Sequence, residues 1–413
     1  MTNTLKLRGL IIFCFIFCSI YSCRKGDKKG YSVVEGFKID TIKINFDLET
    51  ALESEVIDSS VKIVYLKSDS IPVFSVDKLV FSNQSFFISD NFGDRIFCFD
   101  LDGQMKFFIE KPGYGPEEYI EIDDIGVNFI NKTLEVLDTR RQRIVQYDLS
   151  TGAFVSAKSY DFFTKSFSPI GNGGRLFHNS TIPNGQFNGD NYNNSVVYIT
   201  DSLNNLLKTH FPQSEKSLDK IRLVTKNNIF RSYENLNLNY VPLYSSTIYN
   251  LHTENFNLKP HYYLDFGPRN LNDNILKSFN GPMIKFHQYI IESGLVYSVS
   301  DFYETRTTVY FTFYMSGEFY QTVYDKDSKK SLTYRHLIRD KGSFRMRPSG
   351  VFKDNFVTIL SEERILNLVN FFESKFSEKE LEELADYQLF KETKDKNISE
   401  NPVLIFTRYK SID

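Results

Sequence analysis

The chain carries one stretch of sequence twice, and this repeat limits its fold more than any other feature. Residues 86–103 read FFISDNFGDRIFCFDLDG, and residues 134–152 read LEVLDTRRQRIVQYDLSTG. Matching positions lie 48 residues apart, namely Asp90 and Asp138, Arg95 and Arg143, and Asp100 and Asp148. In both copies, short apolar runs are bounded by polar turn residues, which predicts β-strands joined by tight turns.

An all-β unit of this length, repeated along a chain, is typical of the blades of a β-propeller. We assign the first blade to residues 71–112 and the second to residues 122–160. Weaker strand and turn patterns predict four more units, with strands near 195–199, 247–267, 308–324 and 356–360. The fold class is therefore expected to be all-β, a six-bladed β-propeller, although seven blades would also fit the weaker repeats. The 39 Phe and 25 Tyr residues are ample for packing such sheets against one another.

Near the C-terminus the pattern changes from strands to helices. One face of a predicted helix is formed by Ile365, Leu368, Val369 and Phe372. Ser377 and Glu380 fit a capping box that begins a second helix. An apolar run at 403–406 then predicts a last strand that completes the final blade. We expect a propeller over residues 33–413 with a short helical insertion at about 361–392, and closure of the ring would remove exposed sheet edges.

The N-terminal residues resemble an export signal. Lys6 and Arg8 precede an apolar run from Leu10 to Ile20. This run is too short to span a bilayer comfortably and fits the apolar region of a signal peptide. Cys23 follows Ser22 and precedes a polar, Lys-rich stretch, which is similar to a bacterial lipoprotein cleavage site.

This interpretation divides the N-terminus into a signal peptide at 1–22 and a tether at 23–32 that begins with a lipidated Cys23. Two or more acyl chains on one residue are enough for stable anchoring. The alternative is an ordinary signal peptide, or an uncleaved anchor with an incidental cysteine. The expected location is the cell envelope, on the outer membrane at its periplasmic or surface face, with the membrane contacted through the N-terminal lipid.

The number of cysteines and the net charge argue against a disulfide-stabilised protein and against a nucleic-acid-binding protein. Once the signal is removed and Cys23 is lipidated, Cys98 is the one cysteine left, so no intrachain disulfide can form. Cys98 lies between Phe97 and Phe99 in a strand pattern and is predicted to be buried and inert. The formal net charge of −3 argues against a nucleic-acid partner, which would require clustered Lys and Arg in excess.

Several motifs resemble known propeller repeats. The Asp-x4-Arg-Ile-x2-aromatic-Asp pattern at 90–100 and 138–148 looks like the repeat of NHL-type propellers. The GYGPEEY segment at 113–119 resembles the six-bladed β-propeller lipoprotein family of gram-negative bacteria, and 263–267 and 401–404 are also similar to that family. The resemblance implies a lipid-anchored, six-bladed propeller of undefined biochemical role, and it implies no catalytic residues.

The segment 113–119 has two interpretations. It lacks the spacing of a phosphate-binding loop, so it is either a shaped connection between blades or a binding loop on a propeller face. Arg140 and Arg141 have no counterpart in the first blade and are candidates for contact with an acidic partner, unless they belong to a solvated loop. The candidate binding-loop residues are Tyr114, Glu117, Glu118, Tyr119, Arg140 and Arg141.

The repeated Asp and Arg residues are expected to be structural, because a ligand site is used once whereas a structural device recurs with the repeat. Asp90 and Asp138 are predicted to accept backbone hydrogen bonds at turns. Arg95 and Arg143 are predicted to pair with neighbouring carboxylates or carbonyls.

Metal and cofactor sites are not supported by the residue spacing. The acidic residues Glu117, Glu118, Glu121, Asp123 and Asp124 lack the alternation of a calcium loop, so we expect a solvated face there. The six His residues form no close zinc-binding pair, and no Gly-x-Ser-x-Gly motif is present. We predict no metal and no cofactor.

The favoured function is a noncatalytic binding or scaffolding module in the envelope, for a peptide, glycan or partner protein. The alternative is an envelope hydrolase or lyase in which acids and His residues from different blades meet in the central channel. A weaker alternative is the outer domain of a sensor. Whether the protein is an enzyme is left open by the sequence, which favours a protein that is not.

Overall fold

The strands of the computed structural model pair into six sheets of four or five strands and one small three-stranded sheet within the described part of the chain. The structure describes residues 39–46, 49–58, 62–68, 71–179, 184, 195–212, 229–231, 238–279, 282–339, 342–343, 347–382 and 401–412. These belong to one folded unit that begins at Ile39. The predicted signal peptide, Cys23 and the tether lie outside the described residues.

The first three blades are consecutive antiparallel sheets. The first contains β4 (Lys78–Phe81), β5 (Ser85–Asp90), β6 (Arg95–Asp100) and β7 (Met105–Ile109). The second contains β8 (Asp124–Asn128), β9 (Thr133–Asp138), β10 (Arg143–Asp148) and β11 (Phe154–Ser159). The third contains β12 (Ser166–Pro169), β13 (Arg175–His178), β14 (Ser195–Thr200) and β15 (Leu206–Pro212).

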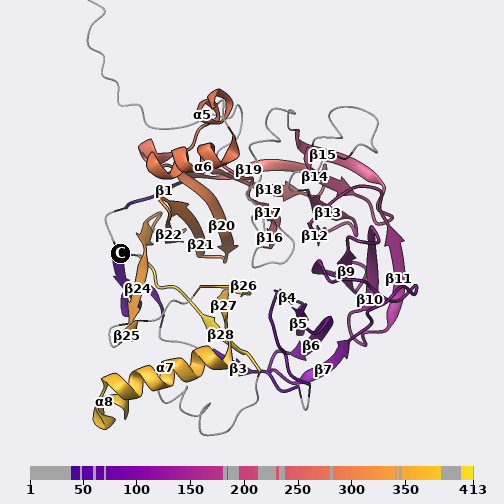
Figure 1. Cartoon of the computed structure of the whole chain (residues 1–413), viewed down its shortest axis with the longest axis horizontal. Coiled ribbons are helices and arrows are strands. Elements are labelled where there is room, and N and C mark those ends of the chain that lie inside the picture. Colours follow the sequence, from indigo (N-terminus) through magenta and orange to yellow (C-terminus); the bar gives the residue numbers. More distant parts are fainter. Residues whose placement is uncertain are drawn as a thin grey trace, which may run out of the picture. The chain divides into compact units, whose positions relative to one another are not determined.

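The last three blades follow the same plan with additions. The fourth contains β16 (Ile229–Arg231), β17 (Leu238–Tyr240), β18 (Thr247–His252) and β19 (Asn257–Asp265). The fifth contains β20 (Val296–Glu304), β21 (Thr308–Met315), β22 (Glu318–Asp325) and β23 (Ser331–Tyr334). The sixth contains β26 (Gly350–Phe352), β27 (Asn355–Leu360), β28 (Val403–Thr407) and β3 (Lys62–Tyr65). Figure 1 shows these sheets around a common centre, so the predicted six-bladed propeller is confirmed.

An N-terminal strap, made of the described residues between 39 and 66, contacts the last three blades in turn. β1 (Asp40–Lys43) pairs in parallel with β19 of the fourth blade. β2 (Thr50–Leu52) leads into the short α2 (Glu53–Val56) and pairs in parallel with β24 (His336–Arg339), which in turn pairs with β25 (Gly342–Ser343). β3 then becomes the outermost strand of the sixth blade.

The ring closes by pairing strands from the two ends of the described chain. β28 pairs antiparallel with β3, with Val403 opposite Tyr65 and Leu404 opposite Val64. The prediction that the run at 403–406 completes the last blade is therefore confirmed. Alternating apolar residues, at 42 and 44 and again at 61, 63 and 65, predict strands in the N-terminal segment, but they do not show that one of these strands forms the edge of the last blade.

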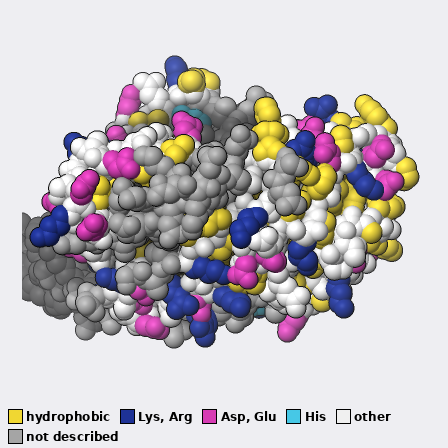
Figure 2. All heavy atoms as spheres, turned by 90° about the horizontal axis from the view of Figure 1, so that it is seen from below, with side chains coloured by type: hydrophobic (Ala, Val, Ile, Leu, Met, Phe, Trp, Pro, Cys, Tyr) yellow, Lys and Arg dark blue, Asp and Glu magenta, His cyan; other side chains and the backbone are white. Residues whose placement is uncertain are grey.

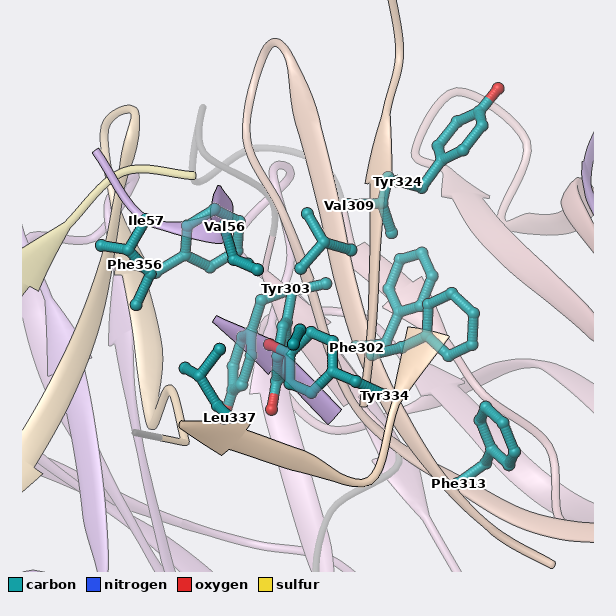
Figure 3. Packing of buried hydrophobic residues seen from close by; sticks show 14 of the residues in the cluster. Val56, Ile57, Phe302, Tyr303, Val309, Phe313, Tyr324, Tyr334, Leu337 and Phe356 are labelled. Carbon is teal, nitrogen blue, oxygen red and sulfur yellow. The ribbon is translucent and has the colours of Figure 1, made fainter. Parts of the chain in front are cut away.

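Aromatic and aliphatic side chains fill the spaces between blades. Phe81 of the first blade stacks on Phe352 of the sixth, with ring centroids 4.9 Å apart. In Figure 3, Val56 and Ile57 of the strap lie beside Phe356 of β27, so the strap contributes to this core. Burying a side chain of this size stabilises the fold by about 1.5–3 kcal/mol.

Two pairs of helices interrupt the strands. The predicted C-terminal pair is confirmed as α7 (Glu362–Lys375) and α8 (Glu378–Glu382), and the Ser377–Glu380 capping box is present. A second pair, α5 (Asp273–Ser278) and α6 (Met283–Glu292), follows the 3-10 helix η1 (Gly267–Arg269) and was not predicted. No helix among the described residues has the length and apolar character needed to cross a bilayer.

Candidate functional site

Loops from the first and second blades meet at one end of the propeller, and we call this surface the loop face (residues 74–77, 91–94, 111–119 and 139–142). The backbone N–H groups of Phe74 and Ser75 donate to the Asp90 carboxylate at 2.9 and 3.1 Å. The Asn91 N–H donates to Asp77, 2.9 Å away. Tyr119 donates its hydroxyl to the Asp94 carbonyl at 2.8 Å, which joins the segment 111–119 to the turn 91–94.

The repeated Asp and Arg residues hold these loops, as the sequence predicted. Asp138 accepts the N–H groups of Ile120 and Arg141, both at 3.2 Å. Arg95 pairs with Glu110 at 3.0 Å. Arg143 donates to the carbonyls of Gly115 and Pro116 (3.2 and 3.4 Å) and to that of Glu118.

The segment Gly113–Tyr119 is a closed loop held on the second blade. Gly113 donates its N–H to the Tyr119 carbonyl at 2.8 Å, and Tyr147 of β10 donates its hydroxyl to the Glu117 carbonyl at 2.6 Å. A Cβ on Gly113 would collide with the Glu118 carboxylate, so this position requires glycine. The loop therefore presents a fixed shape.

The six candidate binding residues divide between surface and interior. The Tyr114 ring is 80% exposed, and Tyr119 is fully buried. Each of the remaining four has a recorded partner: Glu117 pairs with Lys111, Glu118 accepts the Gly115 N–H at 2.6 Å, Arg140 pairs with Glu121 at 2.7 Å and Arg141 donates to the Gly115 carbonyl at 3.0 Å.

Two further exposed rings on the loop face were missed by sequence reasoning. Phe92 is 80% exposed and Phe74 is 55% exposed, and their centroids lie 5.5 Å apart in an edge-to-face pair. The Arg95 guanidinium lies 5.8 Å from the centre of the Phe74 ring. A signal was present in the sequence, because Phe92 occupies the turn between the matched Asp90 and Arg95, where a side chain is not expected to be buried.

The central channel is a second candidate site. It encloses a cavity of about 350 Å³ that is lined by residues from the innermost strand of every blade. One lining residue from each blade, in order, is Leu79, Ile125, Phe167, Ile229, Tyr303 and Gly350. The charged lining residues are Asp77, Lys78, Asp301, Arg347 and Arg364.

Within the acidic cluster at 117–124, the Glu117 and Glu121 side chains are about half exposed, in agreement with the predicted solvated face, but Asp124 is not. Asp124 is buried, forms an ion pair with Lys78 of the neighbouring blade and accepts the Phe167 N–H at 2.9 Å. Burial raises the pKa of Asp123, although the Thr139 N–H donates to it at 2.7 Å. The prediction was wrong for Asp124, because this residue begins the innermost strand β8, which packs between two blades.

The hydrolase or lyase alternative required an acid and a His residue in one cavity. None of the described residues that line the channel is a His. His261 lies 3.4 Å from Glu304, but neither residue lines that cavity. Burial lowers the pKa of His178 to about 4. The described residues contain no group of three or more His, Cys, Asp and Glu side chains that could hold a metal ion. The enzyme alternative stays a prediction.

Charge on the outer surface is mixed. In Figure 2, Lys and Arg side chains stand among Asp and Glu side chains over the described part of that face. Cys98 is buried, and burial raises its pKa to about 11, which favours the inert thiol that the sequence predicted.

The fold and the channel define a six-bladed β-propeller with a closed ring. Residues 37–359 match the model of the family DUF5128, described as a 6-bladed beta-propeller. The chain belongs to this family.

Solved structures share the fold at low sequence identity. The crystal structure of a presumed exported protein of Bacteroides fragilis is 18% identical, with a TM-score of 0.67 over 91% of this chain and 100% of that chain. A member of the DUF4221 family from Bacteroides vulgatus is 12% identical, with a TM-score of 0.49 over 86% of this chain and 98% of that chain. None of the curated proteins matches.

Proposed function

We propose that this protein is a lipid-anchored β-propeller of the cell envelope that acts as a noncatalytic binding or scaffolding module for a peptide, glycan or partner protein. The observation that supports this proposal is the set of exposed rings on the loop face. Phe74, Phe92 and Tyr114 remain in contact with solvent although the loops that carry them are fixed by hydrogen bonds.

Fixed loops with exposed rings suit recognition for two physical reasons. Grouped apolar side chains on a surface gain free energy when a partner covers them, and such groups mark interaction sites. A loop that is already ordered loses little conformational entropy on binding, so more of that free energy remains as affinity. The binding-loop residues predicted from the sequence contribute Tyr114 to this surface, and Arg140 and Arg141 add positive charge beside it.

Envelope localisation is supported by the N-terminal sequence and by the fold. The apolar run before Cys23 has the form of an export signal, and the Bacteroides fragilis protein of the same fold is described as exported. Full-length wild-type protein and Cys23→Ser would be expressed in a gram-negative host with a clickable palmitate analogue. We expect the label and membrane retention in wild type and loss of both in C23S. A labelled C23S protein would contradict lipid anchoring at this residue.

Binding through the loop face is tested with a matched pair of variants. The triple variant Phe74→Ser, Phe92→Ser, Tyr114→Ser removes the three rings. The control Ile130→Ser, Leu203→Ser, Leu207→Ser removes three exposed apolar side chains from turns and a strand outside the loop face. Partners cross-linked in native envelopes would be identified with wild type, and their affinity then measured with purified components.

We expect the loop-face variant to bind the identified partner at least about 30-fold more weakly than wild type, because exposed aromatic anchors commonly contribute about 2 kcal/mol or more. The control should retain wild-type affinity. Equal weakening in both triple variants would reject the loop face as the binding surface. Turnover of the bound peptide or glycan by wild type would reject the noncatalytic role.

A further inference from the structure

A cleft between the sixth blade and the first blade has a positively charged wall. Its volume is about 470 Å³, within the range of about 300–1,000 Å³ that small-molecule sites occupy. The charged residues that line it are Lys62, Lys353 and Arg408. None of the described lining residues is an Asp or a Glu. Such a wall favours an anionic ligand, because an anion relieves the repulsion among the three cations.

Lys353 and Arg408 have no carboxylate partner in the described part of the chain. Lys353 is exposed, and its ammonium lies 5.3 Å from the centre of the Phe352 ring. Arg408 is exposed and donates from Nε to Asn355 Oδ1 at 3.1 Å, which leaves its two terminal nitrogens for a ligand. Asp58 donates its backbone N–H to the Arg408 carbonyl at 2.8 Å, but no ion pair joins these two side chains.

Two carboxylates lie beside the cleft, and each is already paired with a cation. Asp354 follows Lys353 in the chain, and Arg306 donates from Nε to its two oxygens at 3.1 and 3.0 Å. Asp102 lies 3.3 Å from Lys62, and the two side chains are 85% and 58% exposed. An ion pair this exposed contributes little free energy. Lys62 can therefore exchange Asp102 for a ligand.

The cleft lies at the end of the propeller opposite the loop face. Successive turns of an antiparallel sheet alternate between its two ends. The loop face contains turns between the second and third strands of a blade, such as 91–94. In the cleft, Lys353 lies between the first and second strands of the sixth blade, and Leu101 between the third and fourth strands of the first. The cleft is therefore separate from the exposed rings of the loop face.

The folded unit begins at the same end as the cleft. Asp40, the first residue of β1, lies 3.7 Å from Lys329, which belongs to the turn between the third and fourth strands of the fifth blade. If a lipid on Cys23 anchors the chain, as proposed above, the anchor is joined to the propeller on the side that carries the cleft. A lipid headgroup is therefore one source of an anion, and a free small molecule is the other.

We infer that this cleft binds a phosphate monoester group, carried by a lipid headgroup or by a free phosphate ester. Such a group carries a charge of about −1.5 to −2 at pH 7 and three acceptor oxygens, so Lys62, Lys353 and Arg408 can donate to it together. A guanidinium matches two phosphate oxygens with parallel N–H groups, and an ammonium supplies a compact charge. The site does not require that the loop face binds a partner.

Isothermal titration tests the free ester. Full-length protein in phosphatidylcholine nanodiscs is titrated with glycerol 3-phosphate, and empty nanodiscs are the blank. Glycerol, which lacks the phosphate, is the comparison. We expect one saturable site for glycerol 3-phosphate, and at least about tenfold weaker binding of glycerol, because the three cations have no charge to bind in glycerol.

Cross-linking tests the lipid headgroup. The same protein is placed in nanodiscs that contain photoactivatable phosphatidic acid, whose headgroup is a phosphate monoester. Nanodiscs with photoactivatable phosphatidylcholine are the comparison. If the headgroup enters the cleft, mass spectrometry should find phosphatidic acid, but not phosphatidylcholine, on peptides that contain Lys353 or Arg408.

Variants separate a defined site from general attraction of anions to basic side chains. Lys353→Gln with Arg408→Gln should weaken glycerol 3-phosphate binding about 30-fold or more. The control, Lys132→Gln with Lys330→Gln, removes two charges from exposed turns at the same end of the propeller but outside the cleft. Lys132 also matches Lys353 in backbone conformation, with φ of 53° and 54°. The control should keep wild-type affinity, and both double variants should keep the wild-type melting temperature.

Binding of either source would support the site, and the two experiments tell the sources apart. Cross-linking at the cleft without saturable binding of the ester identifies a lipid headgroup, and ester binding without cross-linking identifies a free ester. The inference is overturned if the ester does not bind up to about 10 mM and no cross-link forms at the cleft. Equal weakening in the cleft and control variants would also overturn it. The loop-face triple variant should bind the ester normally, so failure of this site and failure of the proposed function give different results.

Discussion

At the scale of single residues, Glu304 shows how the propeller accommodates a buried carboxylate. It is 5% exposed and accepts hydrogen bonds from Asn239 at 2.7 Å and Tyr262 at 2.8 Å. It also pairs with Lys326 at 2.6 Å and lies 3.4 Å from His261. Burial alone would raise the pKa of Glu304, but His261 and Lys326 together lower it from 4.5 to about 2.

This pKa makes a prediction about stability. Because the pKa of Glu304 is lower in the folded chain, its carboxylate stabilises the fold above about pH 4.5, and this contribution is lost as the pH falls toward 2. Glu304→Gln should lower the free energy of unfolding by about 3 kcal/mol near neutral pH, since the partly buried Lys326 ammonium loses its carboxylate partner. The difference from wild type should shrink in urea titrations at about pH 3.

Glu318→Gln is the matched control, because Glu318 forms a half-exposed ion pair with Arg335. It should change the free energy of unfolding by less than about 1 kcal/mol. A deficit in E304Q that stays constant from neutral to acid pH would show that the carboxylate charge does not stabilise the fold.

The role of a residue was predictable from the sequence where its hydrogen-bond partners lie close to it in the chain. Asp90 accepts the N–H of Gly93 in its own turn, and Asp138 likewise accepts that of Arg141, so the repeat carries their function. Asp124 was misassigned because its partner Lys78 is 46 residues away. The exposure of Phe74 cannot be read from local sequence, since it depends on how separate strands meet.

At the scale of elements, two buried side chains of β10, Arg143 and Tyr147, hold the loop 113–119. Arg143→Met removes hydrogen bonds to three carbonyls of this loop. We expect a loss of about 2 kcal/mol in stability and about 30-fold faster amide exchange in 111–119. Hydrogen exchange with mass spectrometry measures the exchange of this segment.

The repeat supplies the control for this prediction. Arg95 is the equivalent of Arg143 in the first blade, but it pairs with the exposed Glu110. Arg95→Met should therefore cost less than about 1 kcal/mol. Equal effects of the two substitutions would mean that the hydrogen bonds to the loop carbonyls do not hold the segment.

Strands were predictable from the sequence where both strands of a pair belong to one short hairpin. The hairpins of the first, second and fifth blades, and helices α7 and α8, follow from alternation, turn residues and helix spacing. The strap was recognised as strands, but its parallel pairing with β19 joins residues more than 200 positions apart, so no local pattern encodes it. Helices α5 and α6 were missed because they lie in an insertion that the blade repeat does not contain.

At the scale of the whole molecule, the repeat favours six blades but also fits seven, and it does not show which strand pairs with the C-terminal run to close the ring. β3 and β28 come from opposite ends of the chain and together complete the sixth blade. Every blade thereby packs against two neighbours, and no blade ends the series. Stacked repeats without closure can open from either end, whereas a closed ring must lose two interfaces before a blade is released.

Because the ring is closed, we predict that a substitution that destabilises one blade also lowers the stability of the other blades. Val64 of β3 lies opposite Leu404 of β28 and is buried in the hydrophobic cluster that also contains Phe81 of the first blade. Val64→Ala should lower stability by about 2 kcal/mol, because it leaves a cavity at the closing seam. If the ring unfolds as one unit, the slowest amides of β9 and β10 in the second blade should exchange about 30-fold faster, just as those of β27 and β28 do.

Two substitutions in the second blade complete the test. Val136→Ala, at a fully buried position of β9, should accelerate exchange in the sixth blade to a similar extent, because coupling through a closed ring is reciprocal. Val155→Ala, at an exposed position of β11, should alter neither blade. In V64A, faster exchange confined to the sixth blade, which includes β3, would show that the blades open independently. Pairing of the two chain ends would then stabilise the last blade without making the whole ring unfold as one unit.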